Sequence, residues 1–257
     1  MQKSKWLAGA LSAALLVGLS TGADAAQLDR YSAMLAAHQC TIRYENVTPG
    51  ERMHTRDSVQ LDWTYRLQEP PEYVNQKYSG TIVLAGERRF LDIDYGSYAK
   101  SVLTKDGKNY LFSRTVKKDK VKYTGTDGKS VRPTDYDLEG ALVEGEDFGP
   151  ENVSRLFSAM LPADKKPLGL PDYHYVGEGS LAGGLHYEDY RTSNASGLEA
   201  VRYYFSSGNL VKIAAASYAR RPDGNLDSRK CVLKINEFTD VPDETVLTLP
   251  SSLKEDK

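Results

Sequence analysis

The chain has 257 residues, of which 40% are hydrophobic, and its formal net charge is −2. This length suits one large β domain or two small domains, and a nearly neutral charge gives no electrostatic case for nucleic acid binding, which needs a clustered basic face. Seventeen tyrosines against four methionines favour β structure, because aromatic side chains suit a half-buried pleated surface.

Residues 1–25 have the pattern of a cleaved signal peptide. Two lysines provide a basic start, an apolar run from Trp6 to Leu19 follows, and Ala23-Asp24-Ala25 places small residues where a signal peptidase reads. We expect cleavage before Ala26 and a periplasmic or otherwise extracytoplasmic product. The apolar run is short and rich in Ala and Gly, so an uncleaved anchor is the less favoured alternative, and we expect no transmembrane segment in the mature chain.

Two segments have helical periodicity. In residues 27–39 the apolar positions recur at spacings of three and four, at Leu28, Tyr31, Met34, Leu35 and His38. Residues 150–161 begin with a proline, continue with apolar residues on one side and end before Pro162. Each segment therefore predicts one short amphipathic helix.

Most of the remaining chain alternates between apolar and polar residues. The clearest strand is 59–67, in which Val59, Leu61, Trp63, Tyr65 and Leu67 share one face. Asp-Gly pairs at 106–107 and 127–128 predict tight hairpins, and the turns at 194–197 and 206–209 separate a three-strand meander. We expect about ten strands, nearly all antiparallel because the connections are too short for crossovers.

These elements predict a mainly β, α+β fold in one domain over residues 26–257. We expect a single curved antiparallel sheet that forms a half-barrel, with the N-terminal helix and a long connection at 139–182, which holds the second helix, as lids. The strand at 198–205 has large apolar residues on both faces, so it predicts either two packed layers or a lined groove, and a two-sheet sandwich is the alternative. The charged tail after Pro250 is expected to fray.

The only two cysteines are Cys40 and Cys231. In an oxidising compartment the simplest interpretation is a disulfide that ties the start of the domain to its last strand. The alternative is two buried free thiols that act as small hydrophobic side chains.

The order of elements, the hairpin SVLTKDGKNYLFSR and the ending Phe238, Thr239, Asp240, Pro242, Asp243, Leu249 and Pro250 together resemble the LolA/LolB-like superfamily of periplasmic lipoprotein carriers. This resemblance covers most of residues 27–250. It implies an incomplete β-barrel that is lidded by helices and holds acyl chains in an apolar cavity. It transfers no catalytic or binding residue.

No motif for catalysis, metal binding or a cofactor is evident. The four histidines are scattered without a paired spacing, and the nucleophile elbow Gly-x-Ser-x-Gly is absent, so we expect no enzyme activity, no metal and no cofactor. A predicted hairpin carries four lysines, Lys117, Lys118, Lys120 and Lys122. The usual explanation is an edge strand that keeps the protein soluble, and the more specific alternative is contact with anionic lipid head groups or a partner.

We therefore predict an exported, non-catalytic protein that binds or carries a lipid, an acyl chain or a lipoprotein in an apolar groove. The candidate groove residues are aromatic side chains on the strands expected to form the sheet: Trp63, Tyr65, Phe90, Phe112, Tyr203 and Phe205. The alternative is a structural or protein-interaction module of the cell envelope that binds no small molecule.

Overall fold

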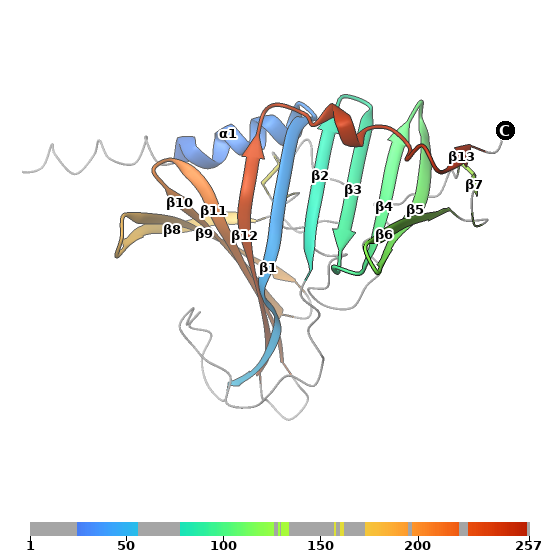
Figure 1. The fold of residues 1–257 in the computed structure, drawn as a ribbon. Helices are drawn as coiled ribbons and strands as arrows, with labels where there is room; N and C mark the ends of the chain where they lie inside the picture. Colours follow the sequence, from blue (N-terminus) through green and yellow to red (C-terminus); the bar gives the residue numbers. More distant parts are fainter. Residues whose placement is uncertain are drawn as a thin grey trace, which may run out of the picture.

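The sheet dominates the part of the chain that the computed structural model describes, namely residues 25–55, 78–125, 128, 130–133, 157, 160–161, 173–194, 197–220 and 226–255. Its strands are β1 (Gln39–Thr55), β2 (Ser79–Ala85), β3 (Arg88–Asp94), β4 (Tyr98–Lys105), β5 (Lys108–Lys117), β6 (Lys120–Gly125), β8 (His174–Leu181), β9 (Leu185–Asn194), β10 (Gly197–Ser206), β11 (Asn209–Arg220) and β12 (Leu226–Thr239). All neighbours in the sheet are antiparallel, in the order β6-β5-β4-β3-β2-β1-β12-β11-β10-β9-β8 (Figure 1). The predicted antiparallel sheet is confirmed, and it is one open sheet with edge strands β6 and β8. The strand β8 corrects one expectation, because residues 174–181 were predicted to belong to the long connection 139–182 and instead form an edge of the sheet.

The predicted hairpins account for most neighbours in this order. Asp106 and Gly107, with φ angles of 54° and 71°, form the two-residue turn between β4 and β5. Ser207 and Gly208 make the equivalent turn between β10 and β11, with φ angles of 49° and 79°. Positive φ at both turn positions matches the right-handed twist of the flanking strands, which is why such turns join adjacent strands.

The first strand pairs with the last one, and this pairing joins two halves of the sheet. β1 lies between β2 and β12, with Arg43 opposite Thr81 on one side and opposite Glu237 on the other. Strands β2 to β6 and strands β8 to β11 are therefore both attached to the central pair, which Figure 1 shows at the middle of a bent sheet.

The α-helix α1 (Ala25–Ala36) precedes β1 and packs across one face of the sheet. Four of the five positions predicted to form its apolar face, Leu28, Tyr31, Met34 and Leu35, are buried. The helix stops before residue 39, where we expected its end, because His38 adopts a left-handed φ of 51° and its carbonyl accepts a hydrogen bond from Gly86 N. His38 therefore belongs to the turn into β1.

Alternation along the strands sorts the core into two clusters on opposite faces. The helix-side cluster contains the α1 side chains together with Ile42, Ile82 and Ile213. The opposite cluster contains Val83 and Leu103 from the sheet, and Leu247 from the C-terminal segment. Because Ile82 and Val83 are consecutive on β2, they point to different faces. The sheet is thus covered by the helix on one side and by the end of the chain on the other.

Two predicted elements fall largely or wholly outside the described residues. The strand 59–67 lies outside them, and so does most of the helix 150–161. Of that segment, Phe157, Met160 and Leu161 are described; Phe157 and Met160 are buried in the helix-side cluster, and Leu161 packs against it. The Ser32 hydroxyl of α1 donates a hydrogen bond to the Met160 carbonyl.

The predicted disulfide is not formed in this structure. Cys40 is a free, fully buried thiol in the helix-side cluster. It precedes Thr41, which lies opposite Thr239, whereas Cys231 lies opposite Ala215, eight residues earlier on β12 than Thr239 (239 − 231). At about 3.3 Å per residue this places the two cysteines more than about 26 Å apart along the strands, and a disulfide requires Cα atoms within about 7 Å. Cys40 instead packs as a small hydrophobic side chain.

The described ranges also include no helix whose length and apolar character would let it cross a bilayer.

Tyr31 offers a test of the packing of α1 on the sheet. Its hydroxyl oxygen accepts a buried hydrogen bond from Leu210 N at 2.8 Å. Tyr31→Phe should lower the free energy of unfolding by about 1–3 kcal/mol, because the Leu210 N–H would lose its acceptor. Urea denaturation measures this, with Tyr98→Phe at an exposed ring as the control that should change little.

Cys40 should not react with thiol reagents in the folded protein. Burial raises the pKa of the Cys40 thiol to about 12, so the reactive thiolate is scarce at about pH 8 and the sulfur is also covered. Iodoacetamide should label Cys40 only after unfolding in urea, as peptide mass spectrometry detects. A Cys40–Cys231 cross-linked peptide in an unreduced digest would contradict the structure.

Candidate functional site

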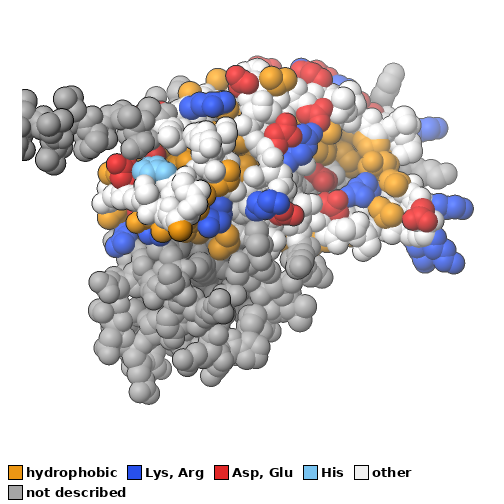
Figure 2. Space-filling model, turned by 60° about the vertical axis from the view of Figure 1, so that its left-hand side comes forward, with side chains coloured by type: hydrophobic (Ala, Val, Ile, Leu, Met, Phe, Trp, Pro, Cys, Tyr) orange, Lys and Arg blue, Asp and Glu red, His pale blue; other side chains and the backbone are white. Residues whose placement is uncertain are grey.

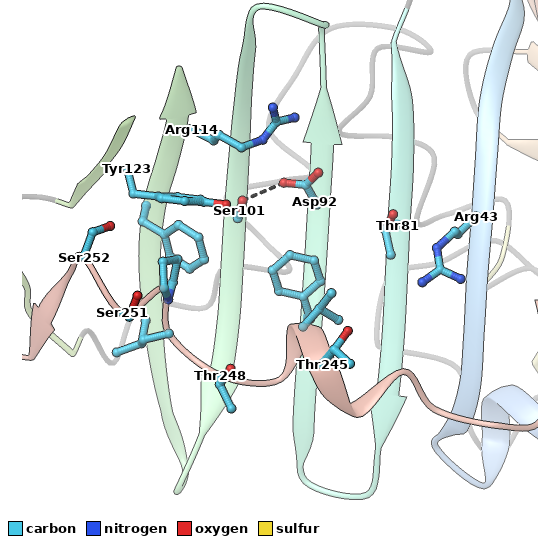
Figure 3. Close-up of a pocket in the computed structure, with 15 residues that line it drawn as sticks. Arg43, Thr81, Asp92, Ser101, Arg114, Tyr123, Thr245, Thr248, Ser251 and Ser252 are labelled. Carbon is cyan, nitrogen blue, oxygen red and sulfur yellow. Dashed lines mark hydrogen bonds between the residues drawn. The ribbon is translucent and has the colours of Figure 1, made fainter. Parts of the chain in front are cut away.

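A pocket of about 570 Å³ lies on the face of the sheet opposite α1 (Figure 3). Its floor is formed by alternate residues of β1 to β6, and its roof by the C-terminal segment 240–255, which we call the strap. Floor residues are Arg43, Thr81, Phe90, Asp92, Ser101, Phe112, Arg114 and Tyr123, and roof residues are Thr245, Val246, Thr248, Leu249, Pro250, Ser251 and Ser252. The site thus needs the strap as much as the sheet.

The floor is organised by strand register. Arg43, Thr81, Asp92, Ser101 and Phe112 lie directly opposite one another in a single row across β1 to β5. Side chains in such a row have Cβ atoms about 5 Å apart, so each contacts the next. The row therefore changes from basic at Arg43, through acidic and hydroxyl groups, to aromatic at Phe112.

The polar centre of the floor is the pair of Asp92 and Ser101. The Ser101 hydroxyl donates a hydrogen bond of 2.6 Å to Asp92 Oδ1, drawn as a dashed line in Figure 3. Burial raises the pKa of Asp92 above its usual value, and the bond from Ser101 and the charge of Arg114 oppose this shift in part. The carboxyl group is thus held in an environment that disfavours its charge.

The two guanidinium groups of the floor are each neutralised by carboxylates. Arg114 Nη2 lies 2.5 Å from Asp94 Oδ2, and the small side chain of Ala99 lies between these two residues in the register. Arg43 forms ion pairs with Glu237 on β12 and with Asp243 on the strap. The pocket therefore has no excess of positive charge that would favour a purely ionic ligand.

The strap is fixed near the start of its course. The Thr41 hydroxyl donates to Val241 O at 2.9 Å and accepts from Asp243 N at 2.8 Å. The Asp243 carboxylate accepts from Thr245 N, and hydrogen bonds from Thr245 together with the charge of Arg43 lower the pKa of Asp243. Asp243 is thereby the N-cap of the short 3-10 helix η3 (Glu244–Val246). Arg88 adds an exposed bidentate ion pair to Glu244.

The far end of the strap is ordered as well, which corrects the expected fraying after Pro250. Leu253 is buried in the cluster opposite α1, and Tyr110 donates a 2.6 Å hydrogen bond to Glu255 Oε1. The strand β13 (Lys254–Glu255) pairs in parallel with β7 (Ser130–Val131). Both ends of the strap are thus held to the sheet, and its middle spans the pocket.

The lining mixes apolar and polar groups. Phe90, Phe112 and Leu249 belong to the cluster opposite α1, whereas the serines and threonines of the strap provide hydroxyl groups. In the space-filling view, hydrophobic side chains lie next to acidic and basic side chains over the visible face (Figure 2). Such a surface suits a ligand with an apolar part and a polar part.

The structure divides the predicted groove residues between the two faces. Phe90 and Phe112 line the strap pocket. Tyr203 and Phe205 lie on the other face, each 1% exposed within the helix-side core. Trp63 and Tyr65 lie outside the described residues. The six aromatic residues are therefore not brought together in one groove.

Sequence reasoning missed the polar residues of the floor. Asp92 lies two residues after Phe90 on the same strand, and Arg114 lies two residues after Phe112, so strand alternation would have placed each polar residue on the face of its aromatic neighbour. The roof gave no such signal, because irregular segments carry no periodicity.

Comparison of the sequence with models of known protein families gives no match, and comparison with curated proteins gives none. Within the described residues there is also no group of three or more His, Cys, Asp or Glu side chains that could hold a metal ion.

Asp92 and Asp94 should respond in opposite ways to removal of their charge. Because the folded-state pKa of Asp92 is raised, its ionised form opposes folding above that pKa, and protonation relieves this cost as the pH falls. Asp92→Asn should leave the protein as stable or more stable at about pH 7, since the amide oxygen still accepts from Ser101. Asp92→Asn should also remove the contribution of Asp92 protonation to the pH dependence of the free energy of unfolding in the acidic range.

Asp94→Asn is the matched control on the same strand. It removes the partner of Arg114 and should destabilise the protein by about 1 kcal/mol. Urea denaturation at several pH values measures both variants. A clear loss of stability at neutral pH in Asp92→Asn would contradict the assignment.

Proposed function

We propose that the protein is an exported, non-catalytic binding protein that shelters an amphipathic ligand, such as a single acyl chain with a small polar head, in the strap pocket. The observation that carries this proposal is the composition of the floor. Phe90 and Phe112 supply an apolar base beside the hydrogen-bonded pair of Asp92 and Ser101. An acyl chain would lie against the rings, and its head group would meet the polar centre.

The size of the pocket supports a ligand of this class. Pockets for small molecules commonly have volumes of about 300–1,000 Å³, and this one is about 570 Å³. The even mixture of lining groups favours an amphipathic molecule over the wholly apolar one that we expected from the sequence. Apolar contacts would provide affinity, and the hydroxyl and carboxyl groups would fix orientation.

Binding without chemistry is supported by the state of the polar groups. The hydroxyl of Ser101 is hydrogen-bonded to a carboxyl group, which is a weaker base than the imidazole or amine groups that commonly activate a serine. The described lining contains neither histidine nor cysteine. Arg43 and Arg114 are held by carboxylates and act as fixed parts of the wall.

Export rests on the N-terminal sequence pattern of residues 1–25, whose basic start, short apolar run and small residues match a signal peptide. The resemblance to the lipoprotein carriers also rests on the sequence. A helix followed by one open antiparallel sheet agrees with the order of parts in that superfamily, and the ligand class is the one that it would imply.

A second candidate function is a cell-envelope interaction module that binds no small molecule. The observation that favours it is the filled core beneath α1, where Tyr203 and Phe205 occupy the place of the groove that we expected. On this alternative the strap pocket would hold only water.

A dansyl-labelled undecanoic acid tests the two functions. The unmodified chain should bind one equivalent, with an increase of dansyl fluorescence, because the chain leaves water for the aromatic floor. Leu249→Ser should weaken binding about tenfold, since a leucine contact in the roof contributes about 1.5 kcal/mol.

Val241→Ser is the matched control, because Val241 lies on the same strap, is 66% exposed and does not line the pocket. It should bind the probe as the unmodified chain does. Absence of saturable binding, or equal weakening by both variants, would contradict the strap pocket as the binding site and favour the interaction module.

A further inference from the structure

The helix-side face of β4, β5 and β6 carries a concentration of lysines at the end of the sheet remote from β8 (Figure 1). Register and alternation place seven exposed residues on this face, which we call the lysine face: Tyr98, Lys100, Leu111, Thr115, Lys117, Lys120 and Lys122. Tyr98 lies opposite Thr115, which in turn lies opposite Lys122 on β6. The strap pocket opens on the opposite face of the same strands.

Charge is segregated between the two faces of these strands. On β3 the acidic residues Asp92 and Asp94 point to the pocket side, and β3 to β6 place no carboxylate on the lysine face. None of the four lysines forms an ion pair within the described part of the chain. By contrast, the pocket-side arginines Arg43, Arg88 and Arg114 are all paired with carboxylates, and the pocket-side Lys105 lies near Asp106 and Glu255.

The lysine face keeps an arrangement that costs stability in the isolated protein. Lys117 and Lys120 lie directly opposite each other where the β5–β6 hairpin turns. Like charges in directly opposed positions of an antiparallel pair are destabilising. The nearest carboxylate in the hairpin is Asp119, which occupies the turn itself. An external anionic surface would relieve this repulsion.

Apolar groups lie among the lysines. Tyr98 is 37% exposed and Leu111 is 38% exposed, and Tyr98 stacks on Tyr95 with ring centroids 6.5 Å apart. Tyrosine favours the boundary between water and lipid, because its ring is apolar and its hydroxyl is polar. Lysine suits the same boundary, since its stem can lie on apolar groups while the ammonium reaches a head group.

The lysines come from three adjacent strands and therefore spread over roughly 10 Å across the sheet, since neighbouring strands are about 4.8 Å apart. Such a spread suits an extended array of negative charges better than a single small anion. We propose that the lysine face docks the protein on the surface of an anionic lipid bilayer. This docking goes beyond ligand binding in the strap pocket, and it leaves that pocket directed away from the bilayer.

Vesicle co-sedimentation of the full chain tests the proposal. The chain should bind vesicles of phosphatidylcholine with phosphatidylglycerol at about 0.1 M salt, and lose most of this binding at about 1 M salt because exposed charges are then screened. Vesicles of phosphatidylcholine alone should not retain it. Each lysine near the surface contributes about fivefold in binding, so Lys117→Gln/Lys120→Gln should weaken binding roughly 20- to 30-fold.

Lys105→Gln/Lys108→Gln is the matched control. Lys105 and Lys108 also form a directly opposed pair beside a two-residue turn, but at the other end of β5 and on the pocket side. This variant removes the same charge and should bind vesicles as the unmodified chain does. Equal loss in both double variants would show attraction by overall charge alone and would overturn the proposal.

Failure of the unmodified chain to bind the anionic vesicles would also overturn it. If the chain ignored vesicles but bound an acidic protein through Lys117 and Lys120, the lysine face would be a protein-docking surface and the bilayer assignment would be wrong. Vesicle binding and binding of the soluble dansyl probe are measured separately, so failure of one proposal is distinguishable from failure of the other.

Discussion

The pairing of β1 with β12 is the constraint on which the rest of the structure depends. β1 follows α1 directly and the strap follows β12 directly, so this one antiparallel pair brings both covering segments to the middle of the sheet. Alternation then sends Ile42 toward the helix and Arg43 toward the strap. Neither the filled core on one face nor the pocket on the other would form without it.

The two faces use different interactions to hold their covers. On the helix side, apolar side chains dominate and the buried hydrogen bond from Leu210 N to Tyr31 fixes the position of α1. On the strap side, two leucines anchor a segment that is otherwise held by hydrogen bonds and ion pairs of Thr41, Arg43 and Tyr110. Leu247 holds the middle of the strap in the core cluster, and the pocket lies beside it, under Thr245, Val246 and residues 248–252.

The sequence predicted the local parts of this structure better than their assembly. Turn chemistry at Asp106-Gly107 and the helical spacing of Leu28 to Leu35 are local signals, and the structure confirms both. The prediction of a Cys40–Cys231 disulfide was wrong. The sequence indicates which strand each cysteine belongs to, but not how the two strands are aligned, and this register is set by pairing between segments almost 200 residues apart. The alternation of side chains along the strands of Phe90 and Phe112 predicts part of the pocket floor. The roof is an irregular segment and has no such pattern.

The joining of the first strand to the last has a consequence for how the chain acquires its structure. Strands β2 to β6 are linked by short turns and can assemble from neighbouring residues alone. Arg43, in contrast, must wait for Glu237, which emerges from the ribosome nearly two hundred residues later. Contacts between distant parts of a chain close slowly because of loop entropy, so the middle of this sheet is expected to be its last part to form. Until then, the apolar surfaces on both sides of β1 remain open to solvent.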